Sequence, residues 1–318
     1  MDKDYRQLKL WQGILILASA ALIIFVISPR FLSSFGLYGT LLAELLMLAA
    51  ALVLVTLFKG NPKEVFPVKK PAGVGIFGTV LMWVGTLLAE MTLTLILAIF
   101  FPQQIMGVSA GLSMQMTDVP FLVAVLIIAV TPAVCEEAVF RGAFLSSLNP
   151  GRHKWGAILI TGVIFGMFHG SIFRFLPTAI GGIVMAYILV ESGNMFYNSF
   201  FHFVNNLLPT VLLFGMQGIY DKIGLWDMQG SQSMLAAQGS SMFMVSAGMY
   251  MMICAAAPSC FYIGNYLLHS HTPGYKDRLF PSGKAGTVIA LIVASALLFF
   301  AGIVLMAFGI IKTGLSLQ

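Results

Sequence analysis

The sequence predicts an all-α protein, a polytopic bundle of about eight to nine transmembrane helices. The chain has 318 residues, of which 59% are hydrophobic and 9% are charged, whereas a soluble domain is about 25% charged. Apolar runs of about 20 residues, the length that crosses a bilayer, recur from end to end. Because its basic residues lie in short segments between these runs, the net charge of +5 indicates membrane topology and not a nucleic-acid partner.

Apolar runs along the chain give nine candidate spans: 11–28, 36–58, 73–101, 119–148, 155–171, 174–193, 196–216, 241–268 and 285–312. The first follows basic residues, as in a signal peptide, but it is too long and lacks a clear small-residue cleavage site, so we expect a retained helix. The fourth contains Pro132, where a kink is expected because proline removes a backbone donor. The polar segments 102–118 and 217–240 are expected to be external loops.

The basic residues also predict how the chain is oriented. With the N-terminus in the cytoplasm, the inside segments hold twelve Lys and Arg residues and the outside segments four, with the intramembrane Arg141 left out. This asymmetry fits the positive-inside rule and favours an odd number of spans with an external C-terminus. We expect one membrane-embedded domain over residues 1–318, in a plasma membrane of prokaryotic type because no terminal retention signal is evident.

Polar residues inside three of the predicted spans are the candidates for chemistry. Glu136, Glu137 and Arg141 lie in the fourth span, His169 in the fifth and His202 in the seventh. An ionisable side chain at bilayer depth costs about 2.5–3.5 kcal/mol on insertion scales. Proton chemistry in a protected cavity is the role that would best offset this cost.

The spacing in the fourth and fifth spans suggests separate roles. Glu137 and Arg141 are four residues apart, so they can pair along one helix face. Glu136 is then left to face a cavity, where a carboxylate in a water-poor site can act as a general base or acid. The structural alternative is a buried ion pair that only fixes helix packing.

In the fifth span, His169 could likewise form only an interhelical hydrogen bond. Phe165, one turn before it, would be a wall of the same cavity.

The seventh span carries Asn198, His202 and Asn206 at intervals of four, which places them on one polar stripe. Such side chains can donate hydrogen bonds to a developing oxyanion, although a stripe can also hold helices together. At 1.5 Å per residue, Glu136 and His169 lie about 18 and 21 Å from the cytoplasmic ends of their helices. His202 lies only about 10 Å from the cytoplasmic end of its helix, so it reaches Glu136 and His169 only if a helix tilts or bends.

Other acids and the cysteines carry weaker signals. Glu44 and Glu90 lie within spans, where each is expected to form a helix–helix hydrogen bond as a neutral acid, and Glu191 is expected to be solvated near a helix end. Gly162 in the fifth span permits close helix approach. The cysteines are expected to be small core hydrophobes without a disulfide framework: Cys135, Cys254 and Cys260.

Taken together, the three motifs resemble the CPBP family. This family includes CAAX-processing type II prenyl endopeptidases, bacteriocin-processing or self-immunity proteins and "abortive infection" membrane proteases. Its pattern is Glu-Glu-x-x-x-Arg, Phe-x-x-x-His and His-x-x-x-Asn, which stand here at 136–141, 165–169 and 202–206. The resemblance covers residues 119–216, the expected catalytic core.

The resemblance implies intramembrane endoproteolysis. Glu136 would activate a water that His169 helps to hold, and His202 and Asn206 would stabilise the oxyanion. Because the resemblance favours a metal-free site, no cofactor is expected. Members are often labelled metalloproteases, so a zinc site of Glu136, His169 and His202 stays an alternative. The family core usually has eight helices, against nine predicted here.

The implied partners are membrane lipid and a peptide or membrane-protein substrate, which could be a C-terminally lipidated protein. Nothing in the sequence requires that this lipid be a prenyl group. Two other functions stay open. A non-catalytic membrane scaffold or immunity protein would tolerate loss of Glu136. A proton-coupled transporter would relay protons through intramembrane acids and histidines, but such proteins usually contain internal repeats, and no convincing repeat is evident.

Overall fold

The computed structural model describes residues 5–223, 228–272, 274–276, 278–280 and 285–316. Within these residues, eight helices are long and apolar enough to cross a membrane. They are Leu10–Phe35, Leu37–Leu57, Gly73–Phe100, Phe121–Ser147, Ile172–Ser192, Met195–Gln217, Gly239–Ser270 and Ala285–Gly314. The predicted polytopic helical bundle is confirmed, and the chain is an integral membrane protein.

Three expectations about individual segments are wrong. The predicted span 155–171 contains only the 14-residue helix α9 (Lys154–Met167), which at about 21 Å is shorter than the hydrocarbon core. The predicted loop 102–118 is helix α5 (Pro102–Thr117), with proline at the first position, where it favours a helix start. The predicted loop 217–240 is largely helical, because α11 (Met195–Ile223) and α12 (Met228–Cys254) extend into it. Residues 224–227 of that loop lie outside the described residues.

The chain forms two compact units that alternate along the sequence. The first comprises Met1–Pro71, Ser113–Phe168 and Gly182–Gly215, and the second Ala72–Leu112, His169–Gly181 and Met216–Gln318. Helix α10 (Ile172–Ser192) and helix α11 contribute to both. The expectation of one domain over residues 1–318 therefore stays a prediction.

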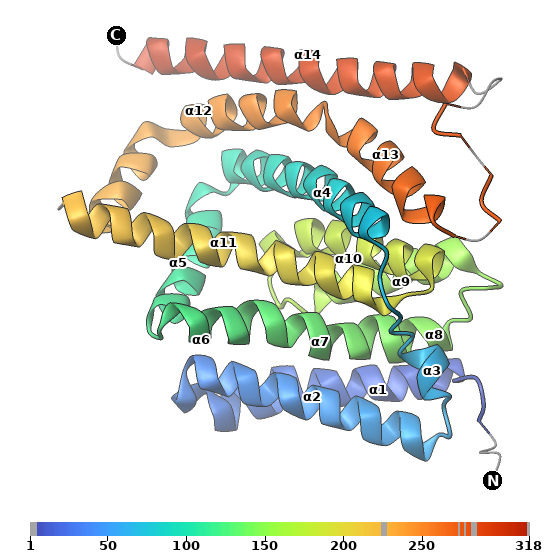
Figure 1. Cartoon of the computed structure of the whole chain (residues 1–318). Helices are drawn as coiled ribbons and strands as arrows, with labels where there is room; N and C mark the ends of the chain where they lie inside the picture. The colour runs from blue at the N-terminus through green and yellow to red at the C-terminus, as the bar shows by residue number, and fades with distance from the viewer. Residues whose placement is uncertain (1–4, 224–227, 273, 277, 281–284, 317–318) are drawn as a thin grey trace. The chain divides into compact units, whose positions relative to one another are not determined.

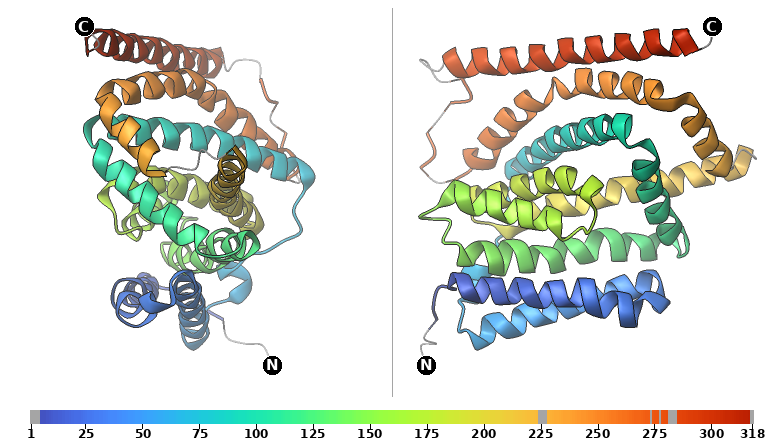
Figure 2. Two further views of the ribbon diagram at one scale, coloured as in Figure 1. Left: turned by 90° about the vertical axis from the view of Figure 1, so that its left-hand side faces the viewer. Right: turned by 180° about the vertical axis from the view of Figure 1, so that it is seen from behind.

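In the first unit, an N-terminal helical hairpin packs along the fourth span (Figures 1 and 2). The hairpin consists of α1 (Leu10–Leu22), the π-helical η1 (Ile23–Leu32) and α2 (Leu37–Leu57). The fourth span is made of α6 (Phe121–Val125), η3 (Leu126–Val130), α7 (Thr131–Glu137), η4 (Ala138–Phe144) and α8 (Leu145–Ser147). Helix α1 contacts η4 and α8, and α2 contacts α7. The fourth span is the most buried of the eight and forms the centre of this unit.

In the second unit, glycines let helices approach closely. Gly78 of α4 (Gly73–Phe100) lies against Gly264 of α13 (Ala257–Ser270). Gly248 of α12 lies against Gly302 of α14 (Ala285–Ser316) in the same way, and these two helices run side by side (Figure 1). Such contacts between small residues replace the hydrophobic driving force that helices lack in lipid.

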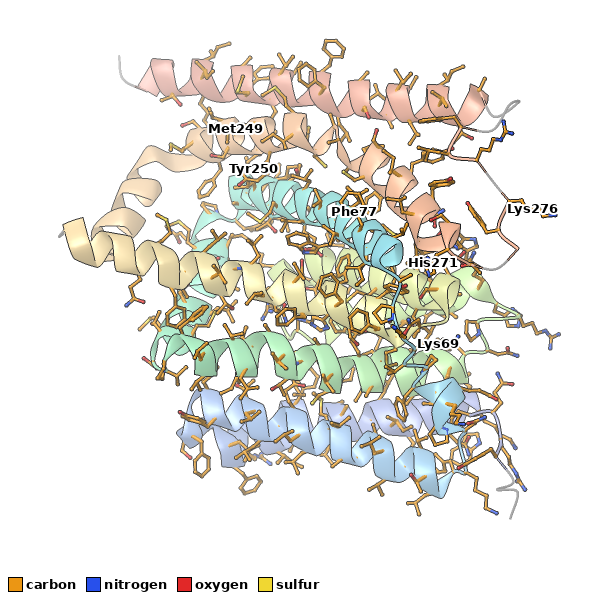
Figure 3. The ribbon with its side chains drawn as sticks, viewed as in Figure 1. Lys69, Phe77, Met249, Tyr250, His271 and Lys276 are labelled. Atoms are coloured by element: carbon orange, nitrogen blue, oxygen red, sulfur yellow. The ribbon has the colours of Figure 1, made fainter. Side chains whose placement is uncertain are left out.

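At one end of the first unit, two basic segments approach the ends of α10 and α11. Asn194 bonds the backbone N–H and C=O of Lys69 at 2.9 and 3.2 Å, and Figure 3 shows Lys69 in the connection after α3 (Pro62–Val65). Lys154, the first residue of α9, forms an ion pair with Glu191 near the end of α10. The expectation that Glu191 is solvated is therefore wrong, because Lys154 lies beside it. These contacts bring Lys69 and Lys154 to the same end of the first unit, next to residues 191–194.

Candidate active site

A buried ion pair within the fourth span forms the centre of the site. Glu137 is the last residue of α7, and Arg141 lies one turn further in η4. Oε1 of Glu137 and Nη1 of Arg141 are 2.9 Å apart, and both side chains are fully buried. The pair predicted from the spacing is confirmed. Charges removed from water in this way need further hydrogen bonds to be tolerated.

Helix α11 supplies two of these bonds. Asn198 donates from Nδ2 to Oε2 of Glu137 at 2.5 Å, and Nδ1 of His202 lies 2.8 Å from Oε1 of Glu137. Since an ionised carboxylate only accepts hydrogen bonds, His202 donates from Nδ1. The predicted polar stripe therefore meets the fourth span, despite the difference in estimated depth. Together, Arg141, Asn198 and His202 hold the Glu137 carboxylate in one orientation.

Arg141 makes two more contacts that tie the site to its walls. Its Nη2 donates to the carbonyl of Gly182 at 3.1 Å. Its guanidinium carbon lies 4.0 Å from the centroid of the Phe165 ring, a cation–π arrangement. The same ring packs edge-on against the His202 imidazole, with centroids 5.7 Å apart. Phe165 thus forms a wall of the cluster, as predicted.

Glu136 differs from its neighbour in access and in partners. Its side chain is 18% exposed, whereas that of Glu137 is fully buried. Its Oε2 lies 3.7 Å from Nε2 of His202 and has no hydrogen-bond partner among the described residues. The prediction that Glu136 stays outside the Glu137–Arg141 pair is confirmed. An unsatisfied buried carboxylate oxygen beside an imidazole is a place where a water or a substrate can bind.

Asn206 is held by a carbonyl that proline leaves unpaired. In an α-helix, the N–H of residue 132 would donate to the carbonyl of Ile128, but Pro132 has no N–H. Nδ2 of Asn206 donates to this carbonyl at 3.0 Å. The π-helical segment η3 ends directly before Thr131, and such segments often mark functional sites. Asn206 therefore has a defined place one turn beyond His202 along α11.

His169 is the predicted site residue whose position relative to this cluster is not determined. It is the first residue of the segment His169–Gly181, which belongs to the second unit, whereas the preceding residue, Phe168, is the last of a segment of the first unit. Its expected role in holding the water stays a prediction.

The sequence did not assign Glu44 to the site. It lies on α2 and is only 4% exposed, and its carboxyl group interacts directly with that of Glu136. Its one signal in the sequence is the position of an acid within a span, which Glu90 shares. Glu90 lies in the second unit, where a Cβ added at Gly181 would meet its Oε1. The residues next to Glu44 in the sequence therefore do not mark it, and not Glu90, as a site residue.

A groove of about 230 Å³ opens beside the cluster, between α7 and α11. All but one of its lining residues are apolar: Val130, Ala133, Val134, Phe196, Ser199, Phe200 and Phe203. Ala133 and Ser199 precede Glu136 and His202 by three residues, which is about one helical turn. The groove therefore begins next to the cluster, although Glu136 is not among its lining residues.

The alternative zinc site of Glu136, His169 and His202 stays untested, because the position of His169 relative to the other two residues is not determined. In the part of the chain that the structure describes, no three His, Cys, Asp or Glu side chains gather as metal ligands would. The ring nitrogen Nδ1 of His202 is engaged by Glu137, and its Nε2 lies 3.7 Å from Glu136. The expectation of a site without a cofactor stays a prediction.

Comparison with known proteins agrees with the motifs. Residues 118–208 match the family model described as type II CAAX prenyl endopeptidase Rce1-like. No curated protein and no solved structure matches the chain. The matched segment contains all three motifs and every residue placed in the buried cluster except Glu44, which lies on α2. Residues 118–208 are therefore similar to Rce1-like type II CAAX prenyl endopeptidases, which supports the resemblance to the CPBP family.

Proposed function

We propose that this protein is an intramembrane endopeptidase in which Glu136 activates a water for attack on a peptide bond. The observation that carries the proposal is the contrast between the two adjacent glutamates. Glu137 is fully buried and bonded by three side chains, whereas Glu136 is partly accessible and keeps an unsatisfied oxygen beside His202. A general base has to be reachable by the proton that it accepts.

In the proposed reaction, the Glu136 carboxylate takes a proton from water while the water oxygen bonds to the substrate carbonyl carbon. The carbonyl oxygen becomes an oxyanion. When this tetrahedral intermediate collapses, the carbon–nitrogen bond breaks and Glu136 passes its proton to the leaving amine. The products are a carboxylic acid and an amine, and Glu136 returns to its starting state.

His202 and Asn206 would stabilise the oxyanion. Because His202 donates from Nδ1 to Glu137, it can donate from Nε2 only when both ring nitrogens carry a proton. Its two ring nitrogens face the two glutamates, with Nε2 3.7 Å from Glu136 and Nδ1 2.8 Å from Glu137. The Asn206 amide uses one N–H bond for Ile128 and has a second one to offer. We propose that His169 holds the water, as the family pattern implies.

The groove beside the cluster suits an apolar substrate segment. A peptide within a membrane must keep its side chains in apolar surroundings, and this groove offers Ser199 as its one polar lining residue. We propose that the substrate is a peptide or membrane protein whose apolar part lies there. Both a lipid-modified and an unmodified segment would satisfy this requirement.

The test is cleavage of fluorogenic peptides by the purified protein in detergent, with and without a lipidated C-terminal Cys. We expect Glu136→Gln to lower kcat by about 10²–10⁴-fold, the usual contribution of a general base, while the protein still folds. Glu191→Gln is the matched control, because it removes a glutamate that pairs with Lys154 outside the cluster. Equal cleavage by wild type and Glu136→Gln would contradict the proposal and favour a scaffold or transporter.

A further inference from the structure

A second carboxyl group, from a different helix, faces the proposed base. Glu44 lies near the middle of α2, which packs against α7. It is 4% exposed, and its carboxyl group is within hydrogen-bonding reach of that of Glu136. Among the described residues, Oε2 of Glu44 and Oε2 of Glu136 are buried without a hydrogen-bond partner. Each acid therefore has capacity for another hydrogen bond.

Hydrogen bonding between them requires a proton. An ionised carboxylate can only accept, so two ionised groups could not hydrogen-bond to each other and would repel each other. If one group is protonated, its O–H donates to the other. Carboxyl pairs in water-poor sites share one proton for this reason.

The charges around the pair indicate the same protonation state. Arg141, on η4 beside α2, is paired with Glu137, so Glu44 has no cationic partner of its own among the described residues of these elements. The other elements packed against α2 offer no countercharge, because α1 and η3 contain no ionisable residue and Arg30 of η1 is exposed. Cys135 of α7 also lies near Glu44. A second uncompensated carboxylate here would carry a large desolvation cost.

We propose that Glu44 is a positioning residue for Glu136: its protonated carboxyl group donates a hydrogen bond to the Glu136 carboxylate and orients the oxygen that receives the proton of the attacking water. The catalytic part of this inference rests on the proposed function. The proton of Glu44 stays in place during turnover. The proton taken from water moves to Glu136 and then to the leaving amine.

Two variants of Glu44 separate positioning from packing. Glu44→Gln keeps the size of the side chain and an N–H donor, so kcat should stay within several-fold of wild type. Glu44→Leu keeps the apolar volume but has no donor, so kcat should fall about 10²-fold, as for a misplaced catalytic group, with KM unchanged. Glu191→Gln again serves as the control. If Glu44→Leu folds and retains the wild-type kcat, or if Glu44→Gln loses as much kcat as Glu44→Leu, the proposal is wrong.

Infrared spectroscopy tests the shared proton without any substrate. Near neutral pH, wild type should show the C=O stretch of a protonated carboxyl group, and Glu44→Gln should lack that contribution. An identical carboxyl band in both proteins would overturn the proposal. Because this measurement needs no cleavage, it keeps its meaning even if the protein cleaves none of the tested peptides.

Discussion

At the scale of single residues, Glu136 and Glu137 are adjacent in the chain but meet different surroundings. The spacing of Glu137 and Arg141 was sufficient to predict the ion pair, and the four-residue stripe on α11 indicated Asn198 and His202 but not that both bond Glu137. Neither pattern could indicate Glu44, because its partner lies more than 90 residues away on another helix. The sequence Leu-Leu-Ala precedes both Glu44 and Glu90, so local context does not separate a site residue from another buried acid.

Glu137→Gln should destabilise the protein, because it leaves the buried charge of Arg141 without its ion-pair partner. Breaking one partner of a buried ion pair costs about 3–5 kcal/mol, which a thermal-unfolding assay in detergent would detect as a lower midpoint. Removing both charges in Glu137→Gln/Arg141→Met should restore much of that loss, because no unpaired charge remains. If the double variant unfolds as early as the single one, an unpaired Arg141 is not the cause. Both variants should cleave poorly, since His202 loses the carboxylate that orients it.

At the scale of elements, Pro132 and Asn206 act as a pair across two helices. Proline removes the donor for Ile128, and Asn206 replaces it. We therefore expect Asn206→Leu to destabilise the wild-type chain by about 1 kcal/mol, the loss of a partly buried hydrogen bond, and to do so much less in a Pro132→Ala background. A double-mutant cycle from thermal unfolding measures this coupling. Strictly additive effects would show that the two residues act independently.

Helix α9 depends on Gly162 for its approach to α10. A Cβ at Gly162 would meet the backbone of Ile183, and one at Gly182 would meet the backbone of Gly162. Gly162→Ala should lower stability by about 1–3 kcal/mol through overpacking, and should also lower activity, because Gly182 accepts a bond from Arg141. Gly156→Ala is the control on the same helix, since an added Cβ there meets nothing within 4 Å. A stable and active Gly162→Ala would contradict this packing argument.

Element boundaries were harder to predict than the elements themselves. Apolar composition located the eight spans, but it extended the fifth predicted span beyond Met167, where α9 ends. The segments 102–118 and 217–240 are polar enough to suggest loops, yet helices fill most of both. Pro132 suggested a kink, but it could not show which side chain would satisfy the freed carbonyl, because that partner comes from α11.

At the scale of the whole molecule, we propose that the N-terminus is cytoplasmic and that the protein lies in a plasma membrane of prokaryotic type. Helix α9 is too short to count as a span by length, so the predicted odd number of spans does not follow from the helix count. The Lys154–Glu191 pair nevertheless places the start of α9 beside the end of α10. The α9–α10 segment would then leave the cytoplasmic side and return to it.

Labelling of single cysteines would test this orientation. In a chain whose three native cysteines are replaced by alanine, Lys63→Cys and Arg152→Cys should react with a membrane-impermeant maleimide only after the cells are permeabilised. Arg30→Cys should react in intact cells, because the orientation places it outside. All three positions are exposed, so differences in burial do not complicate the comparison. Labelling of Arg152→Cys but not Lys63→Cys in intact cells would contradict the proposed topology.

In the proposed mechanism, a water activated by Glu136 attacks the peptide bond directly, without a covalent intermediate on the enzyme. The most direct measurement is a single turnover in ¹⁸O-labelled water, followed by mass spectrometry of the peptide products and of the Glu136 side chain. We predict one ¹⁸O atom in the new carboxyl group of the N-terminal product, none in Glu136, and no labelled product from Glu136→Gln. An ¹⁸O atom in Glu136 with an unlabelled first product would show that Glu136 attacks the substrate itself, and labelled product from Glu136→Gln would show that another group activates the water.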